Sequence, residues 1–371
     1  MNEKIKVLCV FGTRPEVIKM APIIHELKRR PEQFITRTCA TAQHRDMLDQ
    51  AIKLWQIIPD IDLDVMKAGQ TPSQVAAKVL MGLDSVLIEE KPDWILVQGD
   101  TTTVLASAIA AHHLRIKIGH VEAGLRTYDK WNPFPEEMNR VLADHLSDLC
   151  FAPTERAKAA LLKEGISTEK VIITGNTVVD ALLQVNQQNW QPQADSFLAQ
   201  LPQDKHLLLV TAHRRESFGK PMAAICNALK QIARRNDVHI VFPVHLNPNV
   251  RKIVYETLAD IPTISLIDPV DYQELVYLMR QCKLILTDSG GIQEEAPTLA
   301  KPVLVLRQTT ERPEAVAAGV ARLVGTDTNR IIASVTELLD DESVYAVMSS
   351  GANPYGDGQA AQRIADALQQ N

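Results

Sequence analysis

The stretch Ile5-Lys6-Val7-Leu8-Cys9-Val10-Phe11-Gly12-Thr13-Arg14-Pro15-Glu16 opens the chain. Its apolar run predicts a strand buried on both faces of a sheet, and Gly12 and Pro15 predict a turn into a helix over about residues 15–30. The later stretch Leu207-Leu208-Leu209-Val210-Thr211-Ala212-His213-Arg214-Arg215-Glu216 has the same order of features. This echo predicts two similarly built halves, each opening with a strand, a turn and a helix.

Strand-like runs alternate with helix-like segments along both halves. A helix is expected after Thr71-Pro72-Ser73-Gln74, which offers an N-cap, an N1 proline and an N3 glutamine together. Further strands are expected near residues 34–40, 94–97, 116–121, 169–174, 239–243, 263–266, 284–286 and 303–306. Repeated strand–helix units imply an α/β fold with parallel sheets, whose functional residues lie where strands end.

Composition limits the class of protein. The chain has 371 residues, of which 46% are hydrophobic, so it can bury the cores of two α/β domains. A formal net charge of −6 argues against a broad surface for nucleic acid or acidic membranes. The five cysteines are scattered without a C-x-x-C motif, and no apolar run approaches the roughly 18 residues of a membrane span. We therefore expect a soluble, cytoplasmic protein with reduced cysteines that binds neither nucleic acid nor membrane.

The stretch Leu286-Thr287-Asp288-Ser289-Gly290-Gly291-Ile292-Gln293-Glu294-Glu295-Ala296-Pro297 is a candidate nucleotide clamp. Ser289, Gly290 and Gly291 can bring backbone N–H groups against an anion, and a carboxylate such as that of Glu295 can accept hydrogen bonds from sugar hydroxyls. The same residues also suit a strand-to-helix turn with a serine N-cap and acids that favour the helix dipole. The stretch alone leaves both interpretations open.

Charged residues follow several of the predicted strands. Those that could hold a pyrophosphate are Arg14, Lys19, His213, Arg214 and Arg215. The acids are Asp100, Glu122 and Glu136, and Glu136 shares a helix face with Arg140 at i, i+4. Taken singly, Lys19 or Arg215 also suits a solvated surface charge, and Glu136 with Arg140 a surface ion pair, but the shared position of the charged residues at strand ends favours a site.

Signatures of other enzyme classes are missing. The sequence has no Walker A motif, no H-E-x-x-H and no G-x-S-x-G. Gly356-Asp357-Gly358-Gln359-Ala360-Ala361 matches a relaxed dinucleotide pattern, but it follows Asn353-Pro354-Tyr355 instead of a strand. We therefore expect no nicotinamide cofactor and no metal.

Many ordered blocks of the sequence resemble the bacterial non-hydrolysing UDP-N-acetylglucosamine 2-epimerases. They include Phe11–Glu16, Thr41–Arg45, Gly99–Thr103, Gly119–Thr127, Pro135–Arg140, Gly175–Val178, His213–Ser217, Pro243–Asn249, Thr287–Pro297 and Thr310–Glu314. The resemblance implies a GT-B architecture, with two Rossmann-like domains whose parallel sheets face a central cleft. We place these domains at residues 1–173 and 174–358, with a helix over residues 359–371 that crosses back to the first. The resemblance also implies a homodimer.

The reaction that the resemblance implies interconverts UDP-GlcNAc and UDP-ManNAc for bacterial surface polysaccharides. The C2 hydrogen of the sugar is not next to a carbonyl, so an enzyme must either oxidise a neighbouring carbon or expel UDP to form a glycal. Without a dinucleotide fingerprint, elimination of UDP is the better interpretation; it needs a base for the C2 proton and donors to the leaving group.

Roles for individual residues follow from the resemblance. Asp100, Glu122 and Glu136 match the family's catalytic carboxylates, and Arg140 and His213 match supporting residues of its active site. Those that match its UDP contacts are Arg14, Lys19, Ser289, Gly290, Gly291 and Glu295, besides His213. Which carboxylate is the acid and which is the base stays open.

A regulatory site for UDP-GlcNAc is also implied, because some family members bind the substrate next to the active site. Its candidates are Gln43, His44, Arg214 and His245, with Glu136 shared. Regulated members carry an arginine shortly before a Gln-Thr step, whereas this chain has Gly69-Gln70-Thr71. We therefore expect regulation by substrate to be weak or missing.

Three alternatives compete with this interpretation. A GT-B glycosyltransferase would share the fold and the nucleotide clamp, since fold alone does not determine function. A hydrolysing epimerase would release free ManNAc and UDP. A catalytically inactive UDP-sugar sensor would bind without turnover, although the three retained carboxylates argue against it.

Overall fold

A computed structural model describes residues 3–42, 45–67 and 69–371. The chain forms two compact units, an N-terminal unit of Met1–Ala181 with Tyr355–Asn371 and a C-terminal unit of Leu182–Pro354. Helix α7 (Thr177–Gln187) begins in the first and ends in the second. The domain boundaries expected after residues 173 and 358 stay predictions.

The N-terminal unit is built on a parallel sheet. Within the described residues the sheet has seven strands in the order β3-β2-β1-β4-β5-β6-β7, and every pairing is parallel. The strands are β1 (Ile5–Phe11), β2 (Phe34–Ala40), β3 (Ile61–Asp62), β4 (Trp94–Gln98), β5 (Lys117–Val121), β6 (Leu149–Ala152) and β7 (Val171–Ile173). Because both faces of the sheet are covered, central strands such as β1 and β4 are mostly apolar, which is why the opening run was recognisable as a strand.

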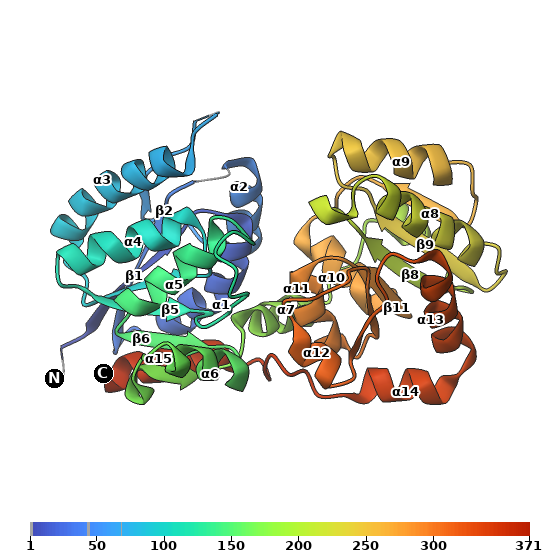
Figure 1. Cartoon of the computed structure of the whole chain (residues 1–371). Coiled ribbons are helices and arrows are strands. Elements are labelled where there is room, and N and C mark those ends of the chain that lie inside the picture. The colour runs from blue at the N-terminus through green and yellow to red at the C-terminus, as the bar shows by residue number, and fades with distance from the viewer. Residues whose placement is uncertain (1–2, 43–44, 68) are drawn as a thin grey trace. The chain divides into compact units, whose positions relative to one another are not determined.

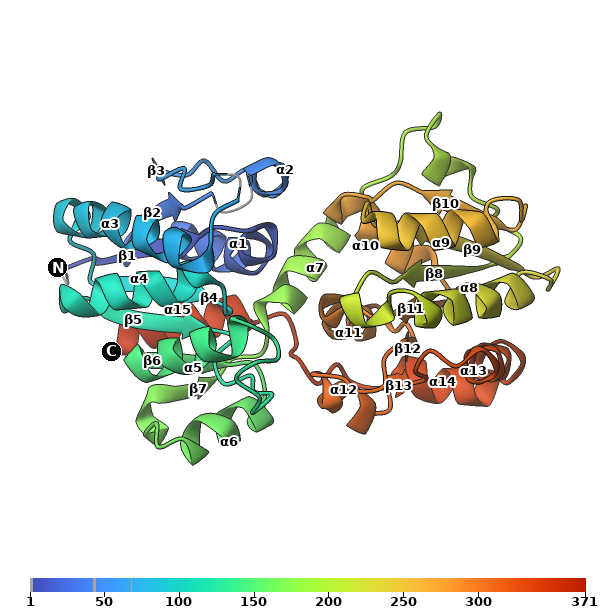
Figure 2. The same ribbon diagram turned by 45° about the horizontal axis from the view of Figure 1, so that its top comes forward.

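Helices cover both faces of this sheet (Figure 1). Figure 2 shows α3, α4 and α5 side by side, while α1 packs against both α2 and α15. The helices are α1 (Arg14–Arg29), α2 (Arg45–Leu54), α3 (Pro72–Glu90), α4 (Thr102–His113), α5 (Glu136–Leu146), α6 (Glu155–Lys163) and α15 (Ala360–Gln370). The predicted start of α3 is confirmed, because Thr71 and Gln74 form a capping box.

The C-terminal unit repeats this plan. Within the described residues, six parallel strands follow the order β10-β9-β8-β11-β12-β13. The strands are β8 (His206–Thr211), β9 (Val238–Pro243), β10 (Ile264–Ile267), β11 (Leu284–Thr287), β12 (Val303–Val305) and β13 (Ala321–Leu323). Its helices are α8 (Lys220–Ile232), α9 (Pro248–Leu258), α10 (Tyr272–Gln281), α11 (Gly290–Glu295), α12 (Pro313–Ala317), α13 (Thr328–Asp340) and α14 (Glu342–Ser350).

Both sheets have the Rossmann strand order, in which the first strand lies beside the fourth at a topological switch point. The prediction of an α/β fold with two Rossmann-like units of the GT-B class is therefore confirmed. The switch points lie between β1 and β4 and between β8 and β11. In open α/β sheets ligands bind beyond the carboxyl ends of such strands, so the turns after these strands are the first place to look for a site.

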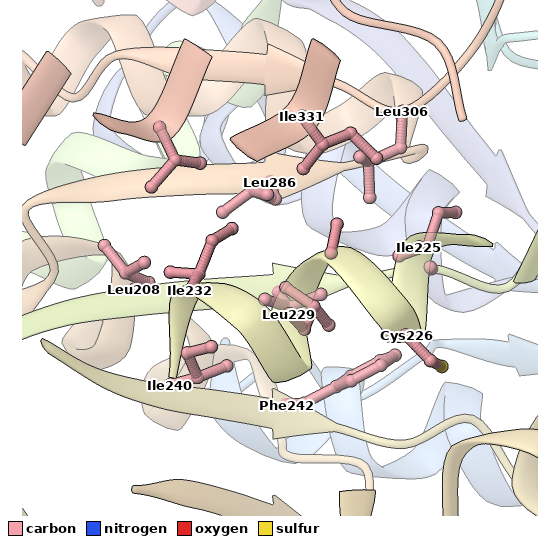
Figure 3. Close-up of a cluster of buried hydrophobic side chains, with 14 of the residues drawn as sticks. Leu208, Ile225, Cys226, Leu229, Ile232, Ile240, Phe242, Leu286, Leu306 and Ile331 are labelled. Atoms are coloured by element: carbon pink, nitrogen blue, oxygen red, sulfur yellow. The ribbon is translucent and has the colours of Figure 1, made fainter. Parts of the chain in front are cut away.

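The hydrophobic core of the C-terminal unit includes side chains of β8 and β11, the two strands at its switch point. Figure 3 shows apolar side chains of α8, α13 and the strands together, among them Leu208, Leu229, Leu286 and Ile331, which are all fully buried. Burying a leucine side chain stabilises the fold by about 2 kcal/mol. Cys226 belongs to this cluster, and burial raises the pKa of its thiol to about 12. The five cysteines, all in the described part of the chain, are free thiols as expected.

The C-terminal helix packs on the N-terminal unit through a buried carboxylate. Asp180 accepts hydrogen bonds from the N–H groups of Ala361 at 2.9 Å and Ala360 at 3.3 Å, which satisfies the start of α15. A Cβ at Gly175 would lie 3.2 Å from the Cα of Gly356. Gly356, the first glycine of the relaxed dinucleotide pattern, therefore serves close packing of two backbones.

Of the helices among the described residues, none combines the length and apolar character that crossing a membrane requires.

Candidate active site

Glu122 follows β5 directly and lies at the centre of a cluster of polar side chains. Its carboxylate accepts hydrogen bonds from Lys19 Nζ at 2.5 Å, Asn176 Nδ2 at 3.0 Å and Gln98 Nε2. The backbone of Glu122 is left-handed, with φ at 66°. Such a conformation costs a non-glycine residue about 1–3 kcal/mol. The surrounding structure therefore holds Glu122 in place against a local preference.

Asp100 lies in the turn after the neighbouring strand β4. Arg140 Nη1 is 3.5 Å from its Oδ2, and Asn139 donates to its backbone carbonyl at 2.9 Å. Burial raises the pKa of Asp100, Arg140 opposes this effect, and the charges of Glu122 and Glu136 add to it. One third of the side chain remains exposed, so the carboxyl group is accessible. The carboxyls of Asp100, Glu122 and Glu136 thus share one electrostatic neighbourhood.

Glu136 is the first residue of α5 and borders a pocket of the N-terminal unit. The pocket has a volume of about 370 Å³, and its lining includes Thr13, Gln70, Thr101 and Glu136. The Oε2 atom of Glu136 is buried and has no hydrogen-bond partner among the described residues. A buried acceptor of this kind is costly unless a ligand or water satisfies it. Glu136 therefore has an oxygen that a bound molecule can use.

Arg140 connects α5 to the cluster. Besides Asp100, it pairs with Glu137, whose Oε2 lies 3.2 Å from Arg140 Nη2. Glu137 in turn accepts hydrogen bonds from the N–H groups of Thr127 and Tyr128. Since Arg140 is almost fully buried, the alternative of a surface ion pair does not hold for this residue.

The turn after β1 is joined to the turn after β4 by Glu16. Its carboxylate accepts hydrogen bonds from the N–H groups of Gly12 at 2.6 Å and Thr13 at 2.7 Å, and from the hydroxyl of Thr101 at 2.5 Å. Arg14, the first residue of α1, is half-buried beside this turn. Lys19 lies on the same helix and, as described above, contacts Glu122.

A buried carboxylate has a similar role in the C-terminal unit. Asp288, which follows β11, accepts hydrogen bonds from the N–H groups of His213 and Arg214, both at 2.8 Å, and from the hydroxyl of Ser217 at 3.2 Å. The Nδ1 atom of His213 lies 3.3 Å from Asp288 Oδ1. The ring of His213 also stacks on that of His245 with centroids 5.4 Å apart. Asp288 therefore joins the turn after β8 to the Ser289–Gly291 turn.

Basic side chains flank the Ser289–Gly291 turn. A Cβ at Gly290 would lie 3.5 Å from Arg312 Nη2 and 3.7 Å from Arg214 Nη2. Ser289 occupies the N-cap position of α11, but within the described structure its side chain makes no capping hydrogen bond. The interpretation as an ordinary capped turn is therefore weakened.

The acids of the same stretch are buried and paired. Glu294 pairs with Arg312, and Glu295 accepts a hydrogen bond from the hydroxyl of Tyr272 at 2.5 Å. They therefore do not serve as exposed charges at a helix N-terminus.

The structure brings the expected residues together within each unit. The N-terminal unit gathers Asp100, Glu122, Glu136, Arg140 and Lys19, and the C-terminal unit gathers His213, Arg214, His245, Ser289, Gly290 and Gly291. Gln43 and His44, two candidates for the regulatory site, lie outside the described residues.

Sequence reasoning missed several partners of these residues, namely Glu16, Gln98, Asn176, Asp288, Tyr272 and Arg312. Gln98, Asn176 and Asp288 each follow or end a strand, so their position was a usable signal. Among the described residues, no group of three or more His, Cys, Asp or Glu side chains could hold a metal ion.

Comparisons with known proteins identify the family. Residues 25–369 match the model of the UDP-N-acetylglucosamine 2-epimerase family. A UDP-N-acetylglucosamine 2-epimerase of Escherichia coli (strain K12) is 54% identical over 374 residues, which cover 99% of both chains.

Two solved structures agree with this match. A UDP-GlcNAc 2-epimerase from Neisseria meningitidis, bound to UDP-GlcNAc, has 46% identity and a TM-score of 0.92, with 99% of this chain and 100% of that chain covered. A UDP-GlcNAc 2-epimerase from Methanocaldococcus jannaschii, in complex with UDP-GlcNAc and UDP, has 36% identity and a TM-score of 0.83 over 99% and 100% of the chains. The chain therefore belongs to the UDP-N-acetylglucosamine 2-epimerase family of enzymes.

Proposed function

We propose that this enzyme reversibly inverts C2 of UDP-GlcNAc to give UDP-ManNAc, without hydrolysing the sugar nucleotide. The single observation that carries the proposal is the cluster of Asp100, Glu122 and Glu136, three carboxyl groups in one electrostatic neighbourhood. Inversion at one carbon requires a proton to leave from one face and return to the other, so more than one proton-transferring group has to lie near that carbon. The UDP-GlcNAc bound to the relative from Neisseria meningitidis supports the choice of substrate.

The proposed mechanism is elimination followed by addition. A base removes the proton from C2, the bond between C1 and the UDP oxygen breaks, and a double bond forms between C1 and C2. UDP leaves with the electron pair, and the second product is 2-acetamidoglucal. Addition of UDP to C1 with delivery of a proton to the opposite face of C2 gives the epimer. No atom is oxidised overall, so the scheme needs no nicotinamide cofactor.

Within this scheme the carboxyl groups have different environments. The raised pKa of Asp100 favours its protonated form, as a proton donor requires. Glu122 lies against the ammonium group of Lys19, which favours a carboxylate. Arg140 pairs with Asp100 and fixes its orientation. The acid and base of each half-reaction are left open, because the two directions of an epimerisation exchange these roles.

The C-terminal unit is proposed to bind UDP. The turn of Ser289, Gly290 and Gly291, flanked by Arg214 and Arg312, suits an anionic pyrophosphate because it combines backbone N–H groups with positive charge. His213 is proposed to contact the same group. Glu295, which Tyr272 holds in place, is proposed to accept hydrogen bonds from the ribose hydroxyls. Arg14 and Lys19 remain predicted UDP contacts.

The decisive experiment incubates the pure protein with UDP-GlcNAc in D₂O, without added nicotinamide, and follows the sugar by NMR. We expect deuterium at C2 and an equilibrium mixture with UDP-ManNAc. Free ManNAc with UDP would instead identify a hydrolysing epimerase, and binding without deuterium incorporation would identify a sensor. A glycosyltransferase would leave the C2 hydrogen in place in the absence of an acceptor.

A second experiment tests cleavage of the bond between C1 and the UDP oxygen. UDP-GlcNAc carrying ¹⁸O in the bridge between C1 and the β-phosphorus should scramble this label into the non-bridging positions of the β-phosphate. An enzyme that epimerises by transient oxidation would exchange no label, which would contradict elimination.

The setting of the reaction is also a proposal. We propose a cytoplasmic enzyme that supplies ManNAc units for bacterial surface polysaccharide, and a homodimer. Exposed apolar side chains on α3, Met81 at 77% and Ile88 at 54%, support an interface on this helix, since they lie seven residues apart on one face. Light scattering on the pure protein tests the dimer, and replacing both residues by Lys should shift it toward monomer.

Regulation by UDP-GlcNAc is proposed to be weak. Gly69 stands where the regulated members are expected to carry an arginine, and it lines the pocket beside Glu136. The rate with UDP-ManNAc as sole substrate should therefore follow a hyperbola. A strongly sigmoidal curve that traces of UDP-GlcNAc restore to a hyperbola would contradict this proposal.

A further inference from the structure

His120 is a buried residue of β5 whose ring contacts two other elements. Its Nδ1 atom lies 2.6 Å from Asp144 Oδ1 on α5, and its Nε2 atom lies 2.7 Å from the carbonyl oxygen of Gly99, just after β4. The side chains of His120 and Asp144 are both 0% exposed. Neither ring nitrogen contacts the carboxyl groups of the proposed reaction directly.

Both partners of the ring are hydrogen-bond acceptors. A backbone carbonyl only accepts, so Nε2 has to carry a proton. The Oδ2 atom of Asp144 lies 2.7 Å from Arg126 Nη2 and accepts a hydrogen bond from the N–H of Gly124 at 3.2 Å. Both contacts favour the carboxylate form of Asp144. Nδ1 therefore also carries a proton, and the ring is an imidazolium.

The ring orients the residue that follows Gly99. The carbonyl of Gly99 and the N–H of Asp100 belong to one planar peptide group, so a hydrogen bond to this oxygen fixes the plane from which the Asp100 side chain emerges. Gly99 has a φ of 82°, and its own N–H donates to the carbonyl of Val121 at 3.1 Å. The N–H and the carbonyl group of Gly99 thus both form hydrogen bonds with residues of β5.

Asp144, the partner of His120 Nδ1, also holds the backbone that follows Glu122. Asp144 accepts the N–H of Gly124, so His120 and Gly124 are fixed two residues before and two residues after Glu122. These two fixed positions explain how Glu122, a non-glycine residue, stays in the left-handed conformation described above. Asp144 also belongs to α5, the helix that begins with Glu136.

We propose that His120, held as an imidazolium, is a positioning residue that fixes Asp100, Glu122 and Glu136 relative to one another. The inference rests on the proposed function, because these three groups are the ones assigned to the reaction. His120 touches neither substrate nor the transferred proton in this arrangement. Its loss lowers kcat, since a displacement of about 1 Å in a reacting group costs about a hundredfold in rate.

The charged groups around the ring determine its titration. Asp144 faces it from α5, Arg126 from the segment after β5, and Cys150 is its register partner on β6. Arg126 is itself paired with Glu164. Burial would lower the pKa of His120, but the charge and hydrogen bond of Asp144 outweigh burial, and the pKa is raised. The imidazolium therefore persists above the usual pH range of a histidine and is lost only as the pH rises through the raised pKa.

The protonation state is tested on the wild-type enzyme by NMR with ¹⁵N-labelled histidine. The signals of His120 are assigned by their loss in His120→Asn. At pH 7.5 we expect both ring nitrogens to carry slowly exchanging protons and to show imidazolium shifts. A single protonated nitrogen would overturn the proposal, and this result does not depend on which reaction the enzyme catalyses.

The positioning role is tested by kinetics of His120→Asn and His120→Gln. We expect kcat to fall about a hundredfold, while KM and the Kd of UDP change less than about threefold. His113→Asn, which alters an exposed histidine at the end of α4, is the matched control. An unchanged kcat in folded His120→Asn, in an enzyme that does epimerise, would overturn the positioning role alone. Failure of the wild type to epimerise would instead overturn the proposed function.

The pH dependence of kcat separates the effect of the His120 charge from that of its shape. It can be measured even if both His120 variants misfold. Asp144→Asn removes the charge that raises the pKa of His120, and burial and the charge of Arg126 then lower this pKa, so the ring should lose its proton at a lower pH than in the wild type. The kcat of this variant should therefore decline at a lower pH than the kcat of the wild type. Parallel profiles for the two enzymes would contradict a role for the imidazolium charge.

Discussion

The ammonium group of Lys19 lies 2.5 Å from the carboxylate of Glu122, and both side chains are nearly buried. This contact joins α1, the helix after the first strand, to the end of β5. Truncating one partner of a buried charge pair costs about 3–5 kcal/mol, because the other charge is left without compensation. The ion pair therefore couples the charge of Glu122 to the position of α1, the helix that begins with Arg14.

Lys19→Met should lower kcat at least tenfold. Methionine keeps the length of the side chain but removes the charge, so Glu122 loses its closest cation. Steady-state kinetics with UDP-GlcNAc measure the effect, and Lys53→Met, on an exposed position of α2, is the control. If Lys19→Met raises KM and leaves kcat unchanged, Lys19 acts only in binding UDP.

Asp100→Asn and Glu122→Gln should each abolish turnover and leave the Kd of UDP within about threefold of wild type. Both substitutions keep the shape of the side chain and remove its ability to transfer a proton. UDP itself is proposed to be held by other groups, chiefly in the C-terminal unit. Calorimetry with UDP and the deuterium assay measure the two properties separately. Loss of UDP affinity with normal turnover at saturation would reverse the assignment.

Tyr272→Phe should weaken UDP binding about tenfold without a matching loss of kcat at saturating substrate. The hydroxyl of Tyr272 donates to Glu295 at 2.5 Å in a buried setting, and a hydrogen bond to a charged group contributes about 1.5–3 kcal/mol. Without it, Glu295 loses its fixed orientation toward the ribose. Calorimetry with UDP checks this result, and Tyr255→Phe on α9 is the control.

The contrary outcome for Tyr272→Phe is equally specific. If UDP affinity is unchanged while the stability of the protein falls, Glu295 is a buried structural acid, and the ribose is held by other residues.

Most of the strands could be predicted from the sequence because they are rich in apolar residues, but the short strands β3, β6 and β13 were missed. Ile5–Phe11 was predicted with the bounds that the structure has, and Glu122 could be singled out because it follows such a run. The turn at Ser289 was harder. Its neighbouring acids could equally have been exposed charges at a helix start, and only their pairing with Tyr272 and Arg312 distinguishes the two cases.

What the sequence could not reveal depends on contacts between distant segments. Asp288 looked like part of a turn, yet it binds the backbone of Arg214, which lies 74 residues earlier. His120 looked like an ordinary strand residue, and its partner Asp144 follows 24 residues later on a helix. Such hydrogen bonds follow from strand order and helix packing, which a local pattern does not contain.

Asp180 gives a prediction about stability that is independent of the reaction. Burial raises the pKa of Asp180 to about 6, although the N–H groups of Ala361 and Ala360 oppose the effect. Below about pH 4 the carboxyl group is protonated in both the folded and the open state and has no effect. Between pH 4 and 6 the open state loses its proton first, so the docking of α15 weakens as the pH rises. Above pH 6 the full cost of burying the charge is present.

Asp180→Asn removes this titration. At about 1.4 kcal/mol per pKa unit, the free energy of opening α15 in the variant should gain roughly 3 kcal/mol relative to wild type between pH 4 and 7. Hydrogen exchange of α15 peptides, compared between the two proteins at each pH, measures this difference, and Asp195→Asn in the C-terminal unit is the control. A difference that stays constant from pH 4 to 7 would show that Asp180 is ionised throughout, with the two backbone N–H groups of α15 fully offsetting its burial.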